Sequence, residues 1–495
     1  MYKKALILAL LLKNCSACFA QSPITLNDVI DDFVIKSPGA KKIRLEYINK
    51  YLDYQNYKKG FLPTLSFSLS PIGFNRSIKL LQNATDGNYS YVEDYVNNGS
   101  TGVTISQNIA PTGGKLSLST SLNMLTEFKE NRNRFSANII KLSYNQKLFG
   151  EYKNYRFKRI LEELNHKNTY RTFCEAMATL QTSAARQYVD IYLLESKRTL
   201  FEDNIKIADT LLHIGKIKNA NGSLSEEELI QLEIQYADDC YKLQELKKDL
   251  LVKRADFAAF LGVKDQDHLF SFTDSVALRY ILYDDFIERV SDYNPFFLSL
   301  EAKRYKAEQQ LHTEIMSERF NADININYGM NQYANNIAEA YLHPTTQEGL
   351  TLSFSIPMFN WGINRNNRII ARNNYERSMI DAENEELEFY NKLKENIENY
   401  NTHLNLLSIS KQSLLLAERK YSLCVKRFYY GEASISELTD AYKEVHTSRQ
   451  THNENLRIVW ESYFSIREDS LYDYLKGEPL EDTFATYYAK EIINQ

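Results

Sequence analysis

The chain has 495 residues, 43% of them hydrophobic, so it can bury a substantial core. It contains only 17 glycines and 9 prolines, which favours long helices over a loop-rich fold. Its formal net charge of −5 argues against nucleic acid as a partner.

Residues 1–20 have the pattern of a secretory signal peptide. Lys3 and Lys4 precede an apolar run over residues 5–12, which is too short to span a bilayer, and small residues near residue 20 offer a cleavage site. We therefore expect an exported mature chain. Removing the segment takes away three lysines and no acid, so the net charge moves to −5 − 3 = −8.

Two of the five cysteines, Cys15 and Cys18, lie in this signal segment. The other three, Cys174, Cys240 and Cys424, are widely separated on helical patterns, so we expect packed thiols and no disulfide framework. Lipid attachment at Cys18 is a weaker alternative, because Cys15 stands where such signals usually carry leucine.

The first half combines helical patterns with one region of strand periodicity. Helices are expected over residues 24–60, 151–215 and 223–261. Between the first two, region 64–149 shows a period of two and is predicted to form strands. Within that region, residues 75–100 are interpreted as a long exposed loop, and an extra hairpin is expected around Gly113 and Gly114.

The second half repeats this order after a connector over residues 263–280. A helix is expected over 281–318, broken at Asn294-Pro295, and strands over 320–357 with a polar loop at 332–347. The long helix that follows carries six apolar residues at seven-residue intervals, which predicts packing against another helix. These residues are Leu393, Tyr400, Leu407, Leu414, Tyr421 and Phe428.

A short turn recurs in both halves, at an offset of 209 residues. Its members are Gly222, Ser225, Glu228 and Leu229 in the first copy and Gly431, Ser434, Glu437 and Leu438 in the second. The spacing predicts a glycine that closes one helix and a Ser/Glu capping box that opens the next. The chain is thus two copies of one helical hairpin: a first repeat over 21–270 with its tip turn at 213–225, a second over 271–476 with its tip turn at 428–437, and a tail over 477–495.

The strands have one apolar and one polar face, which a soluble hairpin would need to cover. In a membrane, strands from several chains would close into a barrel, with the apolar face toward lipid and the polar face toward water. The strand pattern alone leaves a soluble antiparallel sheet equally open. Aromatic residues near the strand ends would suit a membrane interface: Tyr144, Phe149, Tyr341, Phe359 and Trp361.

Four motifs make the chain similar to the TolC-type outer-membrane efflux protein family, over essentially the whole mature sequence. Three are short: Phe61-Leu62-Pro63, Asn294-Pro295, and Ile356-Pro357-Met358-Phe359 followed by Gly362. The most specific is the turn from Arg427 to Ala441, RFxxGxxSxxELTDA, which resembles the family's periplasmic tip.

The resemblance implies a mainly α fold with membrane β-strands: long antiparallel coiled-coil helices that form an α-barrel, and strands contributed to a shared trimeric β-barrel. It implies a homotrimer in the outer membrane of a Gram-negative bacterium, with its helical part in the periplasm. The partners implied are outer-membrane lipid, a periplasmic adaptor protein and an inner-membrane RND or ABC transporter. The function implied is a passive channel of an efflux or type I secretion system.

The resemblance also assigns roles to the tip. Glu437 and Asp440 match the family's acidic constriction, where carboxylates from three copies would repel one another and attract cations. A capping Glu437 and an exposed Asp440 near a helix start remain the alternative interpretation. Ala433 stands where the family often has a basic residue, and Gln231 replaces the second acid in the first repeat. Adaptor contact is expected at Gly222, Ser225, Glu228, Leu229, Arg427, Phe428, Gly431, Ser434 and Leu438.

The sequence has no motif typical of catalysis, so we expect no enzyme, no cofactor and no bound metal. His446 and His452 are six residues apart on one helix, which is poor spacing for a shared metal. The alternative to a channel is a periplasmic or surface structural coiled-coil protein or adhesin without a pore.

Overall fold

The computed structural model describes residues 25–82, 87, 89–263, 278–317, 321–356 and 358–485. The expected signal segment, with Cys15 and Cys18, lies outside the described residues, as does most of the connector. The chain forms two compact units. Unit 1 takes in residues 1–47, 170–295 and 388–495, and unit 2 takes in residues 48–169 and 296–387.

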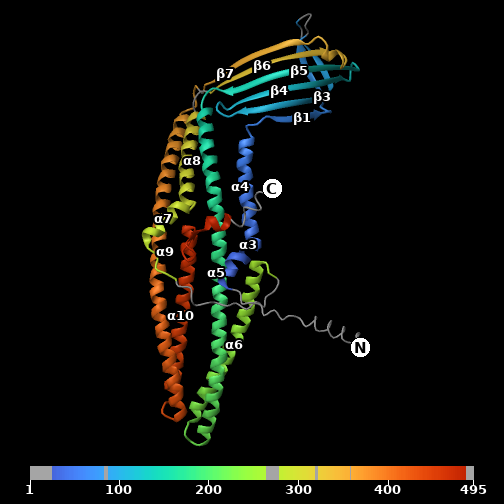
Figure 1. Cartoon of the computed structure of the whole chain (residues 1–495). Coiled ribbons are helices and arrows are strands. Elements are labelled where there is room, and N and C mark those ends of the chain that lie inside the picture. Colours follow the sequence, from blue (N-terminus) through green and yellow to red (C-terminus); the bar gives the residue numbers. More distant parts are fainter. Residues whose placement is uncertain are drawn as a thin grey trace, which may run out of the picture. The chain divides into compact units, whose positions relative to one another are not determined.

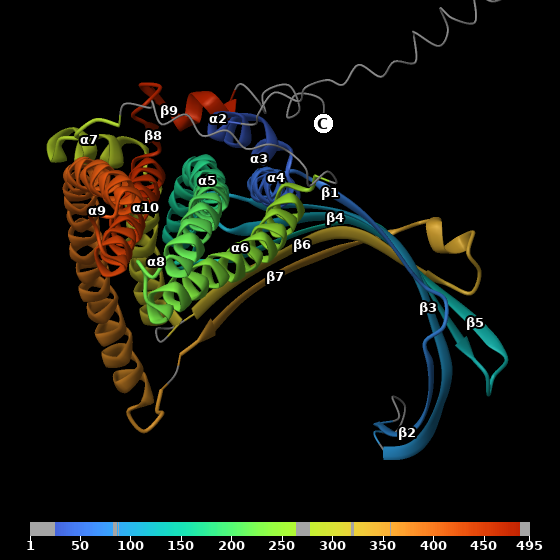
Figure 2. The same cartoon turned by 90° about the horizontal axis from the view of Figure 1, so that it is seen from below.

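Unit 2 contains one antiparallel sheet (Figure 1). Its strands are β1 (Thr64–Ser70), β2 (Phe74–Gln82), β3 (Tyr89–Ile109), β4 (Gly114–Glu127), β5 (Arg132–Lys147), β6 (Asn321–Ala334) and β7 (Thr345–Ser355). They lie in the order β1, β3, β4, β5, β6, β7, and β2 also pairs with β3. Figure 2 shows that the sheet curves strongly between β7 at one edge and β2 at the other.

Strands β1 and β2 lie one after the other along the same edge of β3. Ser70 pairs with Ser100 and Phe74 with Asn97, so only a short interruption separates them. Hydrogen bonds bridge this interruption, from the Asn98 amide to the Gly73 carbonyl at 3.1 Å and from the Gly73 amide to Asn97 Oδ1 at 2.9 Å. The sheet therefore has six strand positions.

The prediction of a loop over residues 75–100 is wrong. Most of this segment is the β2–β3 hairpin, and alternating aromatic residues such as Tyr89, Tyr91 and Tyr95 fit its pleat. Its many Asn and Gly residues suggested a loop, but cross-strand pairing decides the structure. The predicted hairpin at Gly113 and Gly114 is confirmed, because a turn there joins β3 to β4 and Gly113 has a φ of 68°.

The register separates the two faces of the sheet. One row across five strands is apolar: Leu65, Ile105, Leu118, Leu142 and Tyr328. The neighbouring row points to the other face and is polar or small: Thr64, Ser106, Ser117, Ser143, Asn327 and Gly349. The apolar face is open in this structure, where the side chains of Leu65 and Leu350 are 72% and 70% exposed.

Helical segments of α4 (Pro38–Lys59), α5 (Glu151–Ala220), α8 (Phe296–Ser317) and α9 (Ile363–Tyr430) complete unit 2. The ring of Tyr54 on α4 stacks on His166 of α5, with 3.9 Å between ring centroids. On the other side, Lys303 of α8 pairs with Glu385 of α9 at 2.6 Å. Aromatic contacts and ion pairs thus join neighbouring helices.

Unit 1 is helical apart from a short two-stranded ribbon. Its elements are α2 (Leu26–Asp28), η1 (Val29–Phe33), α3 (Val34–Lys36), α6 (Glu226–Leu261), α7 (Tyr283–Tyr293), α10 (Ile435–Ser470), β8 (Tyr472–Asp473), β9 (Glu478–Pro479) and parts of α4, α5 and α9. The predicted breaks are confirmed: Ser37 is extended before α4, and Asn294 is extended between α7 and α8. Pro38 and Pro295 follow these residues, as expected from the restriction that proline places on its predecessor.

The predicted seven-residue repeat on α9 is the packed side of that helix. Leu393 and Tyr400 are fully buried and Phe428 is 2% exposed, while Leu407, Leu414 and Tyr421 are half-buried. The first long helix extends past the expected residue 215 and ends at Ala220. Gly215 stays helical inside α5, and a Cβ there would lie 2.7 Å from the Leu232 side chain, so glycine permits close packing with α6.

The segment after α10 packs onto unit 1 and is more than a tail. Leu480 and Phe484 are fully buried in a cluster with Phe173 and Cys174 of α5. Of the three cysteines described, Cys174 and Cys424 are buried and Cys240 is half-buried, and all three are free thiols, as predicted.

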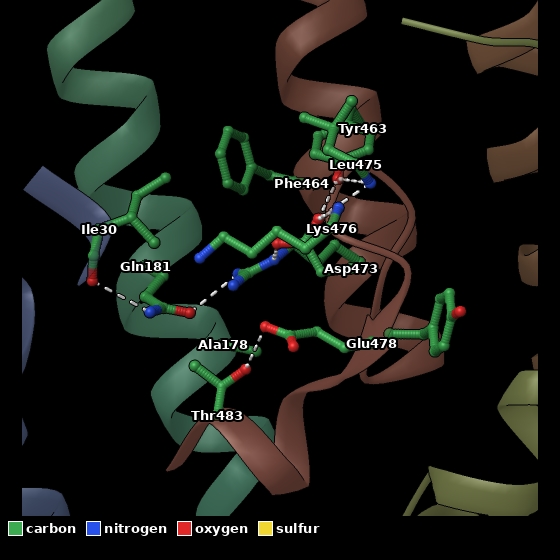
Figure 3. Close-up of polar contacts among 12 residues, drawn as sticks. Ile30, Ala178, Gln181, Tyr463, Phe464, Asp473, Leu475, Lys476, Glu478 and Thr483 are labelled. Carbon is green, nitrogen blue, oxygen red and sulfur yellow. Dashed lines mark hydrogen bonds and ion pairs between the residues drawn. The ribbon is translucent and has the colours of Figure 1, made fainter. Parts of the chain in front are cut away.

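A buried ion pair fastens this segment. Arg467 Nε donates to Asp473 Oδ2 at 3.0 Å, and the two side chains are almost inaccessible. Figure 3 shows Asp473 also accepting from the Tyr463 hydroxyl, and Gln181 reaching the Ile30 carbonyl. Burial would raise the pKa of Asp473, but the charge of Arg467 and the hydrogen bonds from Tyr463 and the Lys476 amide outweigh it, and the pKa is lowered.

Candidate functional site: the paired helical turns

The two repeated turns have the same backbone geometry. Gly222 and Gly431 both take left-handed conformations, with φ of 71° and 80°. After each glycine, a backbone amide reaches back to the last helical turn, from Ser223 to the Lys218 carbonyl and from Glu432 to the Arg427 carbonyl, both at 2.8 Å. This is the Schellman pattern that ends a helix at a glycine. An L side chain at either position would be strained.

Each turn then starts a helix with a capping box. The Glu228 amide donates to Ser225 Oγ at 3.2 Å, and the Ser225 amide donates to the Glu228 carboxylate at 3.0 Å. Ser434 and Glu437 repeat this exchange at 3.2 and 3.4 Å. The hydrogen bonds from Ser225 lower the pKa of Glu228. The predicted glycine and capping box are therefore confirmed in both turns.

Glu437 is engaged within its own turn. Besides capping, its carboxylate lies 3.8 Å from Arg427, whose guanidinium also donates to the Glu432 carbonyl at 2.8 Å. Both side chains of the ion pair are about half exposed, so the pair adds little to stability. Within a single chain, this geometry matches the capping role that the sequence left open.

Asp440 lies one turn further along α10 and is exposed. Its charge acts on Lys420 of α9, which itself pairs with Glu444. Among the described residues, no hydrogen bond or ion pair ties down the Asp440 carboxylate.

The turns are joined by a small apolar cluster. Phe428 and Leu438 belong to it, together with Leu211 and Leu232 of the first hairpin. Leu229 is half-buried beside Gly215. Tyr429 and Tyr430 point outward instead, with exposed fractions of 62% and 76%. These two tyrosines were not among the predicted site residues, although aromatic residues next to a turn are a signal of a binding surface.

Lys218 is a further residue of this region that was not among the predicted site residues. Its ammonium group donates to the Phe428 carbonyl at 2.8 Å and lies 4.7 Å from the centre of the Phe428 ring. The signal was present, because an offset of 427 − 218 = 209 residues makes Lys218 the repeat partner of Arg427. The two cations differ in role: Arg427 closes its own turn, whereas Lys218 ties the first turn to the second.

A buried polar network lies above the turns. The Tyr442 hydroxyl of α10 donates to Asp239 Oδ1 of α6 at 2.6 Å, and Gln235 also donates there at 3.2 Å. Burial raises the pKa of Asp239, and these two hydrogen bonds oppose that rise only in part. Nearby, His446 is within hydrogen-bond distance of Asn204 at 3.2 Å, and burial with three neighbouring cations lowers its pKa to about 4.

The histidines near the turns pack against polar neighbours. The described residues contain no cluster of three His, Cys, Asp or Glu side chains that could hold a metal ion. His446 faces Asn204, and His452 is placed against Ser410 at 3.3 Å. Both histidines are packed side chains of the helical interior.

The fold matches solved outer-membrane channels. An outer-membrane channel from Campylobacter jejuni, CmeC, aligns with a TM-score of 0.66 and 13% identity over 94% of this chain and 89% of that one. A membrane protein from Pseudomonas aeruginosa aligns with a TM-score of 0.65 and 9% identity, over 93% of this chain and 92% of that one. The outer membrane protein VceC from Vibrio cholerae aligns with a TM-score of 0.59 and 12% identity, over 92% of this chain and 96% of that one. The fold is therefore that of outer-membrane channels.

A sequence comparison agrees with the structural matches. Residues 288–462 match the family model described as outer membrane efflux protein. The resemblance to TolC-type proteins is thereby confirmed, and with it the mainly α fold class. The family is one of efflux proteins and not of enzymes. No curated protein matches the chain. No helix in the described part is both long and apolar enough to cross a bilayer.

Proposed function

We propose that three copies of this chain form an outer-membrane channel of an efflux or type I secretion system. The channel passively conducts solutes from the periplasm to the exterior. The observation that carries the proposal is the two-faced sheet of unit 2, whose apolar face is open and whose other face is polar. Lipid would cover the first face and water the second, provided that several copies close the sheet.

The helices of unit 1 support assembly as well. They lie side by side in the order α9, α10, α5, α6 (Figure 2). Ion pairs join each helix to the next: Lys420–Glu444 joins α9 to α10, Arg186–Glu461 joins α5 to α10, and Arg254–Glu195 joins α6 to α5. The outer helices carry exposed apolar side chains away from the packed seam. On α9 these recur every seven residues, at Ile409, Leu416, Leu423 and Tyr430, with exposed fractions of 64%, 60%, 52% and 76%.

On α6, Ile230, Ile234 and Tyr241 are 48%, 57% and 71% exposed. A second apolar stripe at heptad spacing is typical of a helix that packs on two neighbours. The α9 stripe of one copy would meet the α6 face of the next, and repetition of that contact closes a ring. The same stripes would be costly on an isolated subunit in water.

The tip turns are the proposed end toward the inner membrane. A periplasmic adaptor would contact Gly222, Ser225, Glu228, Leu229, Arg427, Phe428, Gly431, Ser434 and Leu438, and an RND or ABC transporter would supply the energy. The exposed Tyr429 and Tyr430 extend this surface. In the trimer, Glu437 and Asp440 would line the constriction, and the free carboxylate of Asp440 makes it the stronger candidate.

The test is to express the full chain, extract it and examine its assembly. We expect extraction from the outer-membrane fraction to require detergent, a trimer by native mass spectrometry, and ion conductance after reconstitution in planar bilayers. A monomer that stays in solution without detergent would contradict the proposal. It would favour the structural coiled-coil or adhesin alternative, for which the open apolar sheet face has no use.

A further inference from the structure

We infer that the extra β3–β4 hairpin is part of the channel wall, so that the trimer closes an eighteen-stranded barrel. The inference rests on the proposed function, in which three copies form a channel in the membrane. The new element is the number of strands, which sets the width of the exit. Each chain contributes six strand positions: four from the first repeat and two from the second.

The hairpin is fully integrated in the sheet. Strand β3 pairs with β4 from Ile109 opposite Gly114 as far as Val96 opposite Glu127. On its other side β3 pairs with β1, and β4 pairs with β5 from Lys115 opposite Asn145 onward. A hairpin that lay outside the wall would leave β1 and β5 next to each other, whereas here two strands separate them.

The hairpin also follows the face pattern of its neighbours. Ile105 and Leu118 continue the exposed apolar row, while Ser106 and Ser117 continue the polar row. Small hydroxyl side chains dominate the polar face of this half and fold onto the backbone: Ser66 Oγ donates to the Thr104 carbonyl at 3.2 Å. Such side chains line a lumen without filling it.

The join between the two repeats is equally specific. At the β5–β6 seam a bulge lies between Asn138 and Ile140, and Gly329 pairs with Lys141 next to it. A Cβ on Gly329 would lie 2.5 Å from the Ile140 carbonyl, so only glycine allows this approach. Bulges and glycines of this kind curve a sheet toward closure.

The two edges fit each other in direction. All neighbouring strands are antiparallel, so with six positions β1 and β7 run in opposite directions. The free edge of β7 in one copy can therefore pair with β1 of the next without breaking the alternation. Long unpaired edges such as β7 promote association, and pairing with a second copy removes them.

The expected consequence is a wide exit. With strands about 4.8 Å apart and tilted by about 40°, a barrel of twelve strands has a backbone diameter of about 24 Å and one of eighteen about 36 Å. The wider barrel keeps an aqueous channel comparable to that of the large porins. An exit of this width would admit bulky cargo, such as a polypeptide.

The first experiment places a fluorophore on single cysteines in full-length trimers in liposomes. We expect Leu118→Cys on β4 to be quenched by brominated lipid and Ser117→Cys by aqueous iodide. Leu352→Cys and Ser353→Cys on β7 serve as the matched pair from the second repeat. Suppose that Leu352→Cys is quenched by brominated lipid and Ser353→Cys by iodide, but that both β4 positions are quenched only by iodide. The hairpin then lies outside the wall, and the inference is overturned. If the β7 pair fails too, the proposed membrane channel itself fails.

A second experiment removes the hairpin. Ser70 lies level with Ser136, through the pairs Ser70–Ser100, Ser100–Asn123 and Asn123–Ser136. Residues 71–135 are therefore replaced by Asn-Gly, which joins β1 directly to β5. With Ser143→Cys in both backgrounds, we expect the largest maleimide-polyethylene glycol that reacts from outside to be smaller in the deletion variant. An unchanged size limit in an assembled deletion trimer would overturn the inference, and if this variant does not assemble, the quenching experiment decides.

Discussion

The ammonium group of Lys218 donates a 2.8 Å hydrogen bond to the backbone carbonyl of Phe428. This contact joins the last turn of α5 to the last turn of α9, and so connects the two repeats at their tips. We expect the two helical hairpins to separate when the periplasmic end of the proposed channel opens. Lys218 would then favour the closed state.

Lys218→Met should weaken this restraint while keeping most of the side-chain volume. The lost hydrogen bond and cation–π contact are worth about 1 to 2 kcal/mol together for a half-buried group. We expect faster hydrogen exchange over residues 218–225 and 427–434, and longer open times in planar bilayers. Lys216→Met is the control, because the pair that Lys216 makes with Glu233 at 3.9 Å is exposed. Equal exchange in the two variants would show that Lys218 does not hold the tips together.

Asp440→Asn should reduce the preference of the channel for cations. One charge at about 4 Å in water is worth about 1 kcal/mol, which corresponds to a change in selectivity of about five-fold. Reversal potentials in a salt gradient measure this ratio. Glu395→Gln removes an exposed acid of α9 far from the turn and should leave the ratio unchanged. If Asp440→Asn keeps the wild-type reversal potential, Asp440 does not line the constriction.

Asp239→Asn should change how stability depends on pH. Burial raises the folded-state pKa of Asp239 above 3.8, so the folded chain binds the proton more tightly than the unfolded chain. The resulting stability is present at low pH and is lost as the pH rises through the folded pKa. Asparagine can still accept the hydrogen bond from Tyr442 but does not titrate.

Thermal unfolding at pH 4 and pH 7.5 tests this effect. The melting temperature of Asp239→Asn, measured relative to that of the wild type, should be higher at pH 7.5 than at pH 4. Asp238→Asn, on an exposed neighbouring position, is the control. The same pH dependence in Asp239→Asn and in the wild type would mean that the Asp239 carboxylate is not the titrating group.

Asp473→Asn should loosen the C-terminal segment. It leaves Arg467, which is 1% exposed, without its counter-charge, and such changes cost about 3 to 5 kcal/mol. Because the pKa of Asp473 is lowered, the contribution of the pair is present above the unfolded pKa and is lost as the pH falls through the folded pKa. In limited proteolysis, the protease should cut Asp473→Asn after α10. The control variant Glu478→Gln, on the same ribbon, should resist the protease as well as the wild type does.

The sequence predicted the repeated turns well because their geometry is local. A glycine that needs φ > 0 and a serine with a glutamate three residues later specify the turn without help from distant residues. The same holds for the breaks before Pro38 and Pro295 and for the heptad seam of α9. These features depend on backbone sterics and on the period of one helix.

Features that depend on pairing between distant segments could not be predicted in this way. The β2–β3 hairpin was interpreted as a loop, since its stability comes from cross-strand contacts and its Asn and Gly residues have low strand propensity. The Lys218–Phe428 bond and the Asp239–Tyr442 bond each join residues more than 200 positions apart. The docking of Leu480 and Phe484 against α5 likewise follows from tertiary packing.

Cryo-electron microscopy of the purified chain in lipid nanodiscs would show whether the chain forms a channel. We expect three copies around one water-filled lumen, with the apolar sheet face against lipid and β7 of each copy paired with β1 of the next. A single self-contained subunit, with its apolar sheet face covered by its own helices and no passage through it, would rule out the proposed channel.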